Sequence, residues 1–206
     1  MGLWARHVLP RLVEHMCALE PVSALRADVV PAAEGRVLEV GFGTGLNLPF
    51  YDPARVTSLV ALEPADAMRS RARDRIAAAP FPLELLPLEG ERIPLDDASV
   101  DTVVVTFTLC SIADVATALA GMRRVLRPGG RLLFCEHGIA PDPRLRRWQR
   151  RVDPLWRRVF GGCHLDRDIP ALLRAGGFAL ERLAAESVPG APRIAAYGYR
   201  GAARPA

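Results

Sequence analysis

The chain has 206 residues, 50% of them hydrophobic and 6% aromatic, and this length suits one well-packed domain better than two. The formal net charge is only +4, and neither a lysine-rich tail nor an aromatic RNA-binding motif points to a nucleic-acid partner. No apolar run is long enough to span a bilayer, and the four cysteines stand far apart without a CxxC pair. We therefore expect a cytoplasmic protein with free thiols, no metal site and no nucleic-acid partner.

The predicted elements begin with a helical extension over residues 1–33, which lacks the apolar core of a secretory signal. Short β-branched runs then alternate with helical stretches at 65–79 and 114–126, and the sequence RPGG at 127 marks a helix stop. The strand-like runs cover 36–40, 56–62, 82–88, 100–107 and 130–137. This alternation predicts an α/β fold, a Rossmann-like sheet of seven mostly parallel strands with helices on both faces.

The last part of the chain has a different pattern. Two strand-like runs, 176–183 and 193–201, are joined by a Pro/Gly turn that is too short for a helix. Strands joined in this way pair antiparallel, so we expect the last strand pair to close the sheet in that orientation.

A glycine-rich turn follows the first predicted strand. Gly41, Gly43 and Gly45 allow a sharp turn whose backbone amides approach a ligand closely, although a lone turn of this kind is also typical of a tight connection. Glu63 ends the second strand, where an acid can accept hydrogen bonds from a ribose diol. Glu39 precedes the turn and would repel a pyrophosphate. The pattern favours a ligand with a ribose but no phosphate.

Several motifs in order, VLEVGFGTG, ALEP, LEGERIPLDDASVDTVVVTFTLCSI and RRVLRPGGRLLFCEH, resemble those of class I S-adenosylmethionine-dependent methyltransferases. The resemblance implies that Glu39 and the turn hold the methionine part of the cofactor S-adenosyl-L-methionine, and that Glu63 takes its ribose hydroxyls. Glu89, Gly90 and Glu91 match the adenine-side loop, but which carboxylate meets the adenine stays open, and Glu91 also fits a solvated loop acid. Further cofactor contacts are expected at Pro64 and Thr106.

A narrower resemblance covers more of the chain. The stretches TFTLCSI, CEHG, WQRRVDPLW and GGCHLDRD are similar to the small methyltransferase-like proteins whose animal members methylate alkyl thiols, and to their bacterial relatives. The start of the chain departs from the membrane-anchoring helix of the animal pattern, so membrane residence is not implied. We expect a single domain over 1–206, with a helical cap over the cofactor mouth (1–33), a cofactor-binding core (34–137) and an acceptor side (138–206).

The acceptor is expected at the carboxyl ends of the parallel strands, where such sheets collect ligands. His137 is the candidate base or orienting group, because imidazole exchanges a proton near neutral pH, although it also fits a histidine that satisfies backbone groups. Cys110 fits packing better than a nucleophilic role. The candidate substrate-binding residues are Leu109, Trp148, Trp156 and His164.

Residues 144–160 are predicted to form two helical pieces, because Pro154 cannot continue the first and Asp153 can cap the second. One interpretation gives the segment a core-facing apolar stripe under a solvated arginine face. The other makes Trp148 and Trp156 a wall of the acceptor pocket, with the Arg144–Arg158 helix touching an anionic membrane surface. The apolar positions at helical spacing are Leu145, Trp148, Val152, Leu155, Trp156 and Val159.

These observations predict methyl transfer from S-adenosyl-L-methionine to a small-molecule acceptor that is largely apolar, with thiol sulfur favoured. O-, N- or C-methylation of a quinone, phenol or lipid-like acceptor is the alternative. A non-catalytic cofactor-binding protein and a nicotinamide oxidoreductase are weaker rivals, and the oligomeric state stays open.

Overall fold

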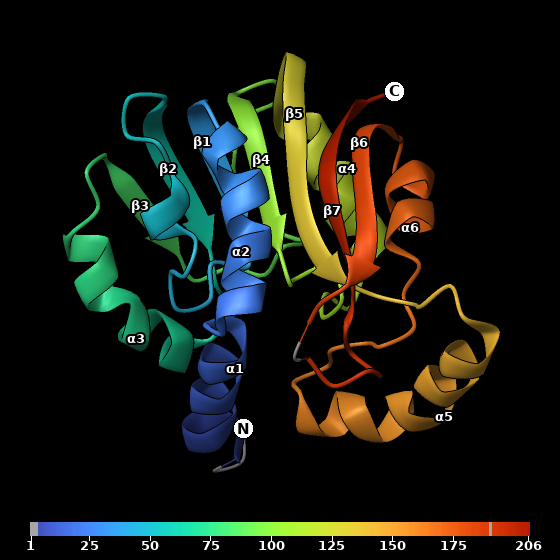
Figure 1. Cartoon of the computed structure of the whole chain (residues 1–206). Coiled ribbons are helices and arrows are strands. Elements are labelled where there is room, and N and C mark those ends of the chain that lie inside the picture. The colour runs from blue at the N-terminus through green and yellow to red at the C-terminus, as the bar shows by residue number, and fades with distance from the viewer. Residues whose placement is uncertain (1–3, 190) are drawn as a thin grey trace.

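A single seven-stranded sheet runs through the computed structural model, which describes residues 4–189 and 191–206 (Figure 1). The strand order is β3-β2-β1-β4-β5-β7-β6, and β7 is antiparallel to both neighbours while the other pairs are parallel. The strands are β1 Gly35–Val40, β2 Val56–Leu62, β3 Leu83–Leu86, β4 Val100–Thr106, β5 Leu126–His137, β6 Phe178–Ser187 and β7 Tyr197–Pro205. The predicted sheet and its antiparallel closing pair are confirmed.

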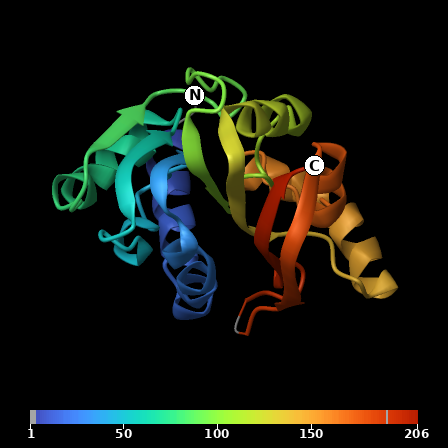
Figure 2. The same cartoon turned by 90° about the horizontal axis from the view of Figure 1, so that it is seen from above.

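Different helices cover the two faces of the sheet, because successive residues of a strand point to opposite sides. Val37 of β1 belongs to the same buried cluster as Leu25 of α2, whereas its neighbour Leu38 belongs to the cluster of Met122 of α4. Figure 2 shows α2 and α4 on opposite sides of the sheet. The helices are η1 Trp4–Val8, α1 Leu9–Cys17, α2 Glu20–Val29, η2 Val30–Ala32, η3 Leu48–Phe50, α3 Asp66–Ala77, α4 Val115–Val125, α5 Pro143–Val159 and α6 Ile169–Ala175.

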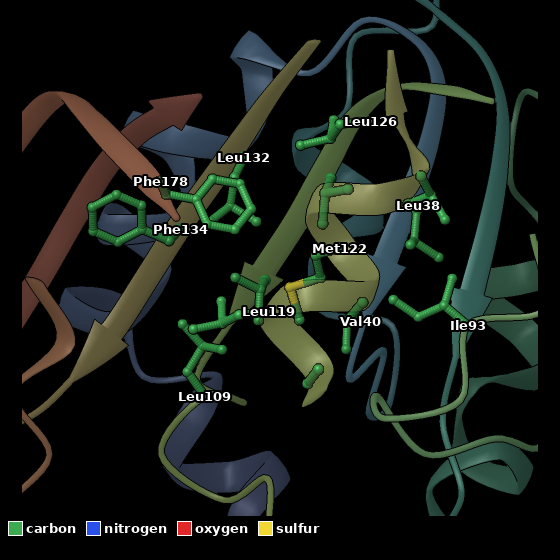
Figure 3. Close-up of a cluster of buried hydrophobic side chains, with 14 of the residues drawn as sticks. Leu38, Val40, Ile93, Leu109, Leu119, Met122, Leu126, Leu132, Phe134 and Phe178 are labelled. Atoms are coloured by element: carbon green, nitrogen blue, oxygen red, sulfur yellow. The ribbon is translucent and has the colours of Figure 1, made fainter. Parts of the chain in front are cut away.

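The α4 side of the sheet holds a large part of the apolar core. Leu119 and Met122 of α4 belong to the same buried cluster as Leu38 of β1 and Phe134 of β5. All four side chains are almost completely buried (Figure 3). Burying such a side chain stabilises the fold by roughly 1.5 to 3 kcal/mol. This packing holds the parallel strands together, so their carboxyl ends form one common edge.

Short polar residues start the helices that flank this core. Asp114 accepts a hydrogen bond from the Thr117 amide at the start of α4, and Asp168 does the same for the Ala171 amide at the start of α6. Both satisfy amides that a helix leaves without an internal partner. Helix α4 ends at Val125, directly before the predicted RPGG stop.

Helix α5 corrects the prediction of two helical pieces, since it runs unbroken through Pro154. Pro154 lies on the exposed side of the helix, where water can satisfy the carbonyl group that proline leaves unpaired. Asp153 is no N-cap, because its carboxylate accepts a hydrogen bond from the Leu165 amide and pairs with Arg157.

Of the two interpretations of the α5 stripe, the structure does not support a fully core-facing one. The buried residues of the helix are Gln149 and Asp153, whereas Trp148 is 59% and Leu155 65% exposed. Gln149 explains the inversion: it accepts a hydrogen bond from the Ala140 amide and donates to two backbone carbonyl groups, so a polar face docks on backbone. Trp148 and Leu155 of the stripe consequently point outward. The other apolar residues of the stripe are half-buried: Leu145, Val152, Trp156 and Val159.

Helices η1 and α1 stay outside the sheet and lie beyond its carboxyl edge, whereas α2 of the predicted 1–33 segment packs on a face of the sheet; residues 1–3 fall outside the described residues (Figure 1). The indole of Trp4 donates a hydrogen bond to the Val159 carbonyl of α5 at 3.1 Å. Glu14 of α1 pairs with Arg71 and Arg75 of α3, and Arg75 also donates to the Thr44 carbonyl in the glycine-rich turn. No described helix is both long and apolar enough to cross a membrane.

Gly201→Ala in β7 is expected to lower the free energy of unfolding by about 1 to 3 kcal/mol, because the new β-carbon would overlap the Arg182 carbonyl oxygen of β6. Gly198→Ala in the same strand is the matched control, since its β-carbon would lie 3.4 Å from Val188, an ordinary contact. We expect the control to change stability by no more than about 0.5 kcal/mol. Urea unfolding measures the free energy of unfolding of both variants. Equal decreases would contradict the close approach of β6 to Gly201.

Candidate active site

The glycine-rich turn lies at the carboxyl end of β1, and its geometry demands glycine. Gly41, Gly43 and Gly45 have φ angles of +79°, +59° and +79°, which side chains of L-residues rarely tolerate. A β-carbon on Gly41 would overlap the side chain of Thr108, so the loop after β4 presses against the turn. A β-carbon on Gly43 would meet nothing within 4 Å, so this part of the turn faces open space.

Glu63 joins the end of β2 to this turn. One carboxylate oxygen accepts a hydrogen bond from the Gly43 amide at 2.8 Å and the other from the Ala65 amide at 2.9 Å. Burial raises the pKa of Glu63, against the effect of these amides. The following Pro64 is exposed, and its carbonyl group accepts a hydrogen bond from Arg69.

Glu39 has a different environment from the one its motif suggests. It is 1% exposed, and its oxygens accept hydrogen bonds from Asn47 at 2.9 Å and from the Tyr51 hydroxyl at 2.6 Å. Burial raises the pKa of this carboxyl group to about 7. Asn47 also donates to the Thr106 hydroxyl at 3.0 Å. The side chain of Glu39 therefore braces the segment after the turn and the end of β4.

Sequence reasoning missed Asn47 and Tyr51, which connect Glu39 to the segment after the turn. Both follow Gly45 within six residues and lie beyond the glycine motif itself, so the motif does not point to them. A buried acid needs partners of this kind, so polar residues close behind an acidic strand end were a usable signal.

The predicted adenine-side loop lies beside the end of β1. A β-carbon on Gly90 would come within 2.8 Å of Val40, which explains why this position is glycine. Glu91 accepts a hydrogen bond from the Asp114 amide at 3.1 Å, whereas the side chain of Glu89 is exposed. A hollow of about 580 Å³ beside this loop contains none of the glycine-turn residues, so we do not assign it to the cofactor.

The loop after β4 is held by Glu136, a residue for which the sequence predicted no role. Glu136 is completely buried, and its carboxylate accepts hydrogen bonds from the amides of Thr108, Leu109 and Cys110 at 2.7, 2.8 and 3.3 Å. Burial raises its pKa, against the effect of the three amides. An acid at a buried strand end that precedes His137 was the available signal.

His137 lies next to two cysteines. Its Nε2 atom is 2.9 Å from the Cys163 sulfur, which is 3.8 Å from the Cys110 sulfur. The other ring nitrogen, Nδ1, is buried and has no hydrogen-bond partner among the described residues. The sequence prediction of no metal-ligand cluster rested on spacing along the chain, and the fold brings these three residues together.

The predicted acceptor residues divide into two groups. Leu109 is completely buried, and the amide of the half-buried His164 donates to the Cys110 carbonyl at 2.8 Å. Trp156 is half-buried and stacks on Phe160 with ring centroids 4.0 Å apart. Trp148 does not join them, because it belongs to the exposed outer face of α5.

Comparison with known proteins identifies the family of the chain. A family model described as "Methyltransferase domain" matches residues 38–134, which include the glycine-rich turn and Glu63. Thiol S-methyltransferase TMT1B of Rattus norvegicus is 36% identical over 140 residues, 66% of this chain and 56% of that protein. Thiol S-methyltransferase TMT1A of Homo sapiens is 32% identical over 166 residues, which is 80% of this chain and 68% of the human protein. The chain belongs to the S-adenosylmethionine-dependent methyltransferases.

Two further similarities describe this methyltransferase. A demethylmenaquinone methyltransferase of Clavibacter sepedonicus is 32% identical over 126 residues, 61% of this chain and 50% of that protein. The structure of a Leishmania major SAM-dependent methyltransferase has a TM-score of 0.71 at 16% identity, covers 98% and 80% of the two chains, and shows the shared fold. The chain spans little more than half of several of its curated relatives.

The residues of this methyltransferase fit S-adenosylmethionine, the methyl donor of the family. The open space at Gly43 leaves room for a ligand against the backbone of the turn. The hydroxyl of Thr44 in the same turn is buried and has no hydrogen-bond partner among the described residues. Glu63 stands at the end of β2, where a sheet of this kind offers a carboxylate to a ribose.

Gly43→Val is expected to abolish S-adenosylmethionine binding, because its side chain would occupy the space in front of the turn. Gly129→Val is the matched control: Gly129 has a φ angle of +82°, also faces open space, and lies outside the turn, so it carries a similar backbone cost. Calorimetric titration should show wild-type affinity for the control only. Equal affinity of both variants would refute the site.

Proposed function

We propose that this chain transfers the methyl group of S-adenosylmethionine to a small, largely apolar acceptor, with a thiol sulfur as the favoured atom. The observation that carries the proposal is the buried, unpartnered Nδ1 of His137 in a cluster with two cysteine sulfurs. This cluster lies at the ends of β4 and β5, the carboxyl edge where we place the donor.

In this proposal the residues at the ends of β1 and β2 hold the donor. The turn Gly41–Gly45 brings backbone against it, and Glu63, with Pro64 beside it, takes the ribose hydroxyls. Glu39 acts through Asn47 and Tyr51, which it positions, and Thr106 shares this network. The Glu89–Glu91 loop serves the adenine side, and the exposed carboxylate of Glu89 is the better placed for it, since Glu91 already has a protein partner.

Bound S-adenosylmethionine supplies an electrophilic methyl group on a positively charged sulfur. The residues of the chain have to remove water, orient the acceptor and take its proton. A thiol suits this site because its pKa of about 8.5 leaves a useful thiolate fraction near neutral pH, while a phenol ionises near 10. His137 accepts the thiol proton, and the buried Leu109 with the half-buried Trp156 and His164 provides the surrounding wall.

The alternative acceptor is a quinone, phenol or lipid-like molecule, methylated on carbon, oxygen or nitrogen. The similarity to a demethylmenaquinone methyltransferase keeps this alternative in view. Family membership leaves no support for a nicotinamide oxidoreductase. A non-catalytic protein that only binds the donor differs from both by giving no methylated product.

Matched thiol and phenol acceptors test the accepting atom. We expect the thiol to have the higher kcat/KM, and its value to rise between about pH 6 and about pH 9 as thiolate forms. His137→Ala should lower thiol kcat/KM roughly a hundredfold at neutral pH, with a smaller loss at high pH, where the solution supplies thiolate. His15→Ala, which changes an exposed histidine of α1, is the control.

Two outcomes would overturn this assignment. Efficient methylation of phenols, quinones or amines with no thiol turnover at any pH would move the accepting atom away from sulfur. Donor binding without product from any acceptor class would instead favour the non-catalytic protein.

We also propose that the outer face of α5 contacts an anionic membrane surface. Trp148 and Leu155 present apolar side chains to solvent, and exposed arginines flank them along the helix. An apolar strip bordered by positive charge matches lipid headgroups that carry negative charge. These arginines are Arg144, Arg147, Arg150, Arg151, Arg157 and Arg158. A peripheral contact of this kind would bring an apolar acceptor close to the edge of the sheet.

Binding to phosphatidylglycerol vesicles tests this surface. We expect the wild-type chain to co-sediment with them, more weakly at high salt, and not with phosphatidylcholine vesicles. The double change Trp148→Asn with Leu155→Asn should weaken binding at least about tenfold, because two apolar groups no longer enter the interface. Leu183→Asn, at a residue 41% exposed on β6, is the control. Vesicle binding unchanged by the double substitution would exclude α5.

A further inference from the structure

Three potential metal ligands converge near the carboxyl edge from separate parts of the chain. Cys110 lies in the loop after β4, His137 ends β5, and Cys163 follows α5. One ligand atom of each lies within 4.8 Å of the other two. Cysteine sulfur and histidine nitrogen are the ligands that zinc prefers in proteins.

We propose that Cys110, His137 and Cys163 bind a zinc ion and leave its fourth position open. Tetrahedral zinc with Zn–S bonds of about 2.3 Å places two sulfurs about 3.8 Å apart. The Cys110 and Cys163 sulfurs are 3.8 Å apart. The same geometry requires about 3.5 Å between a ligating nitrogen and sulfur, so His137 and Cys163 have to separate slightly from their 2.9 Å contact.

The charge of the complete site suits its burial. Cys110 is 1% exposed, and Cys163 is half-buried. Two thiolates and a neutral imidazole cancel the two positive charges of zinc, so the site as a whole carries no net charge. A neutral unit avoids the large cost of placing an isolated charge in a protein interior.

The surroundings hold Cys110 in position before any ion binds. The Cys110 amide donates a hydrogen bond to the buried carboxylate of Glu136, and its carbonyl group accepts one from the His164 amide. Arg167 donates to the Leu109 and Ile112 carbonyl groups on either side. Outer contacts of this kind orient metal ligands and limit the rearrangement that binding requires.

The open position has a use that rests on the proposed function. Three protein ligands and one free position are the arrangement of catalytic zinc sites. With zinc bound, an acceptor thiol would occupy that position as its thiolate and its proton would go to water. His137 would therefore serve as a ligand in the loaded enzyme and as the proton acceptor only in the zinc-free enzyme. A sulfur lone pair then forms the bond to the methyl carbon, while the bond from that carbon to the donor sulfur breaks and its electrons stay on that sulfur. The thioether product is a weak ligand and leaves.

Metal analysis of the reduced chain tests the site directly. After zinc loading and removal of excess metal, we expect one zinc ion per wild-type chain. Cobalt(II) in place of zinc should give a thiolate-to-cobalt charge-transfer band. Cys163→Ser and Cys110→Ala should each lose the band and weaken zinc binding at least a hundredfold, whereas Cys17→Ser, at a cysteine outside the cluster, should keep both.

Wild-type protein that retains no zinc and gives no charge-transfer band would overturn the site. The site would also be overturned if the Cys163→Ser and Cys110→Ala variants keep S-adenosylmethionine binding and bind zinc as tightly as the wild type. If a serine or alanine variant fails to fold, the wild-type stoichiometry and cobalt spectrum decide alone.

Activity separates the zinc site from the acceptor assignment. If the three residues bind zinc but the enzyme does not methylate thiols, the acceptor assignment is wrong and the metal site remains. If zinc-loaded and zinc-free enzyme methylate thiols at the same rate, the open position on zinc has no part in the reaction. A fall in thiol turnover on zinc removal, restored by adding zinc back, is the expected result.

Discussion

Three backbone amides that share one buried carboxylate determine the shape of the catalytic edge. Glu136 ends β5 and holds the amides of residues 108–110, so the loop after β4 cannot move independently of the neighbouring strand. That loop presses Thr108 against Gly41 and presents Cys110 to His137 and Cys163. A charged group in a completely buried position persists only when such donors surround it. Glu136 therefore fixes the position of the donor side of this edge relative to the acceptor side.

Much of the fold could be predicted because apolar runs of strand length alternate with helical stretches. This pattern is local, since it involves residues that are close together in the chain. The glycine turn and Glu63 were also predictable, since both lie directly at strand ends. The Cys110–His137–Cys163 cluster was not, because its members are 26 or more residues apart and only tertiary packing joins them. The cofactor, acceptor and catalytic roles of all the individual site residues stay predictions, as does the division of the domain into three parts.

Helix α5 shows why periodicity alone misplaces a helix face. Its apolar residues recur at helical spacing, and a globular protein normally buries such a stripe. Here the partner surface consists of backbone groups after β5, before β7 and in the loop between α5 and α6. The amide of Gln149 and the carboxylate of Asp153 satisfy these groups, which leucine or tryptophan could not do. The hydrogen-bonding groups of the docking surface determine which face of α5 is buried. The sequence of the helix does not reveal those groups.

Helices η1 and α1 are joined to the rest of the molecule at the carboxyl edge by one indole hydrogen bond to α5 and by the ion pairs of Glu14 with α3, and Pro10 is the one buried residue of α1. Partly exposed contacts of this kind break far more easily than a buried sheet unfolds. Local opening of η1 and α1 thus offers a low-energy route for exchange of donor and product without disturbing the seven strands. If ligands leave by that route, the rate of opening sets an upper limit on turnover however fast the methyl group moves.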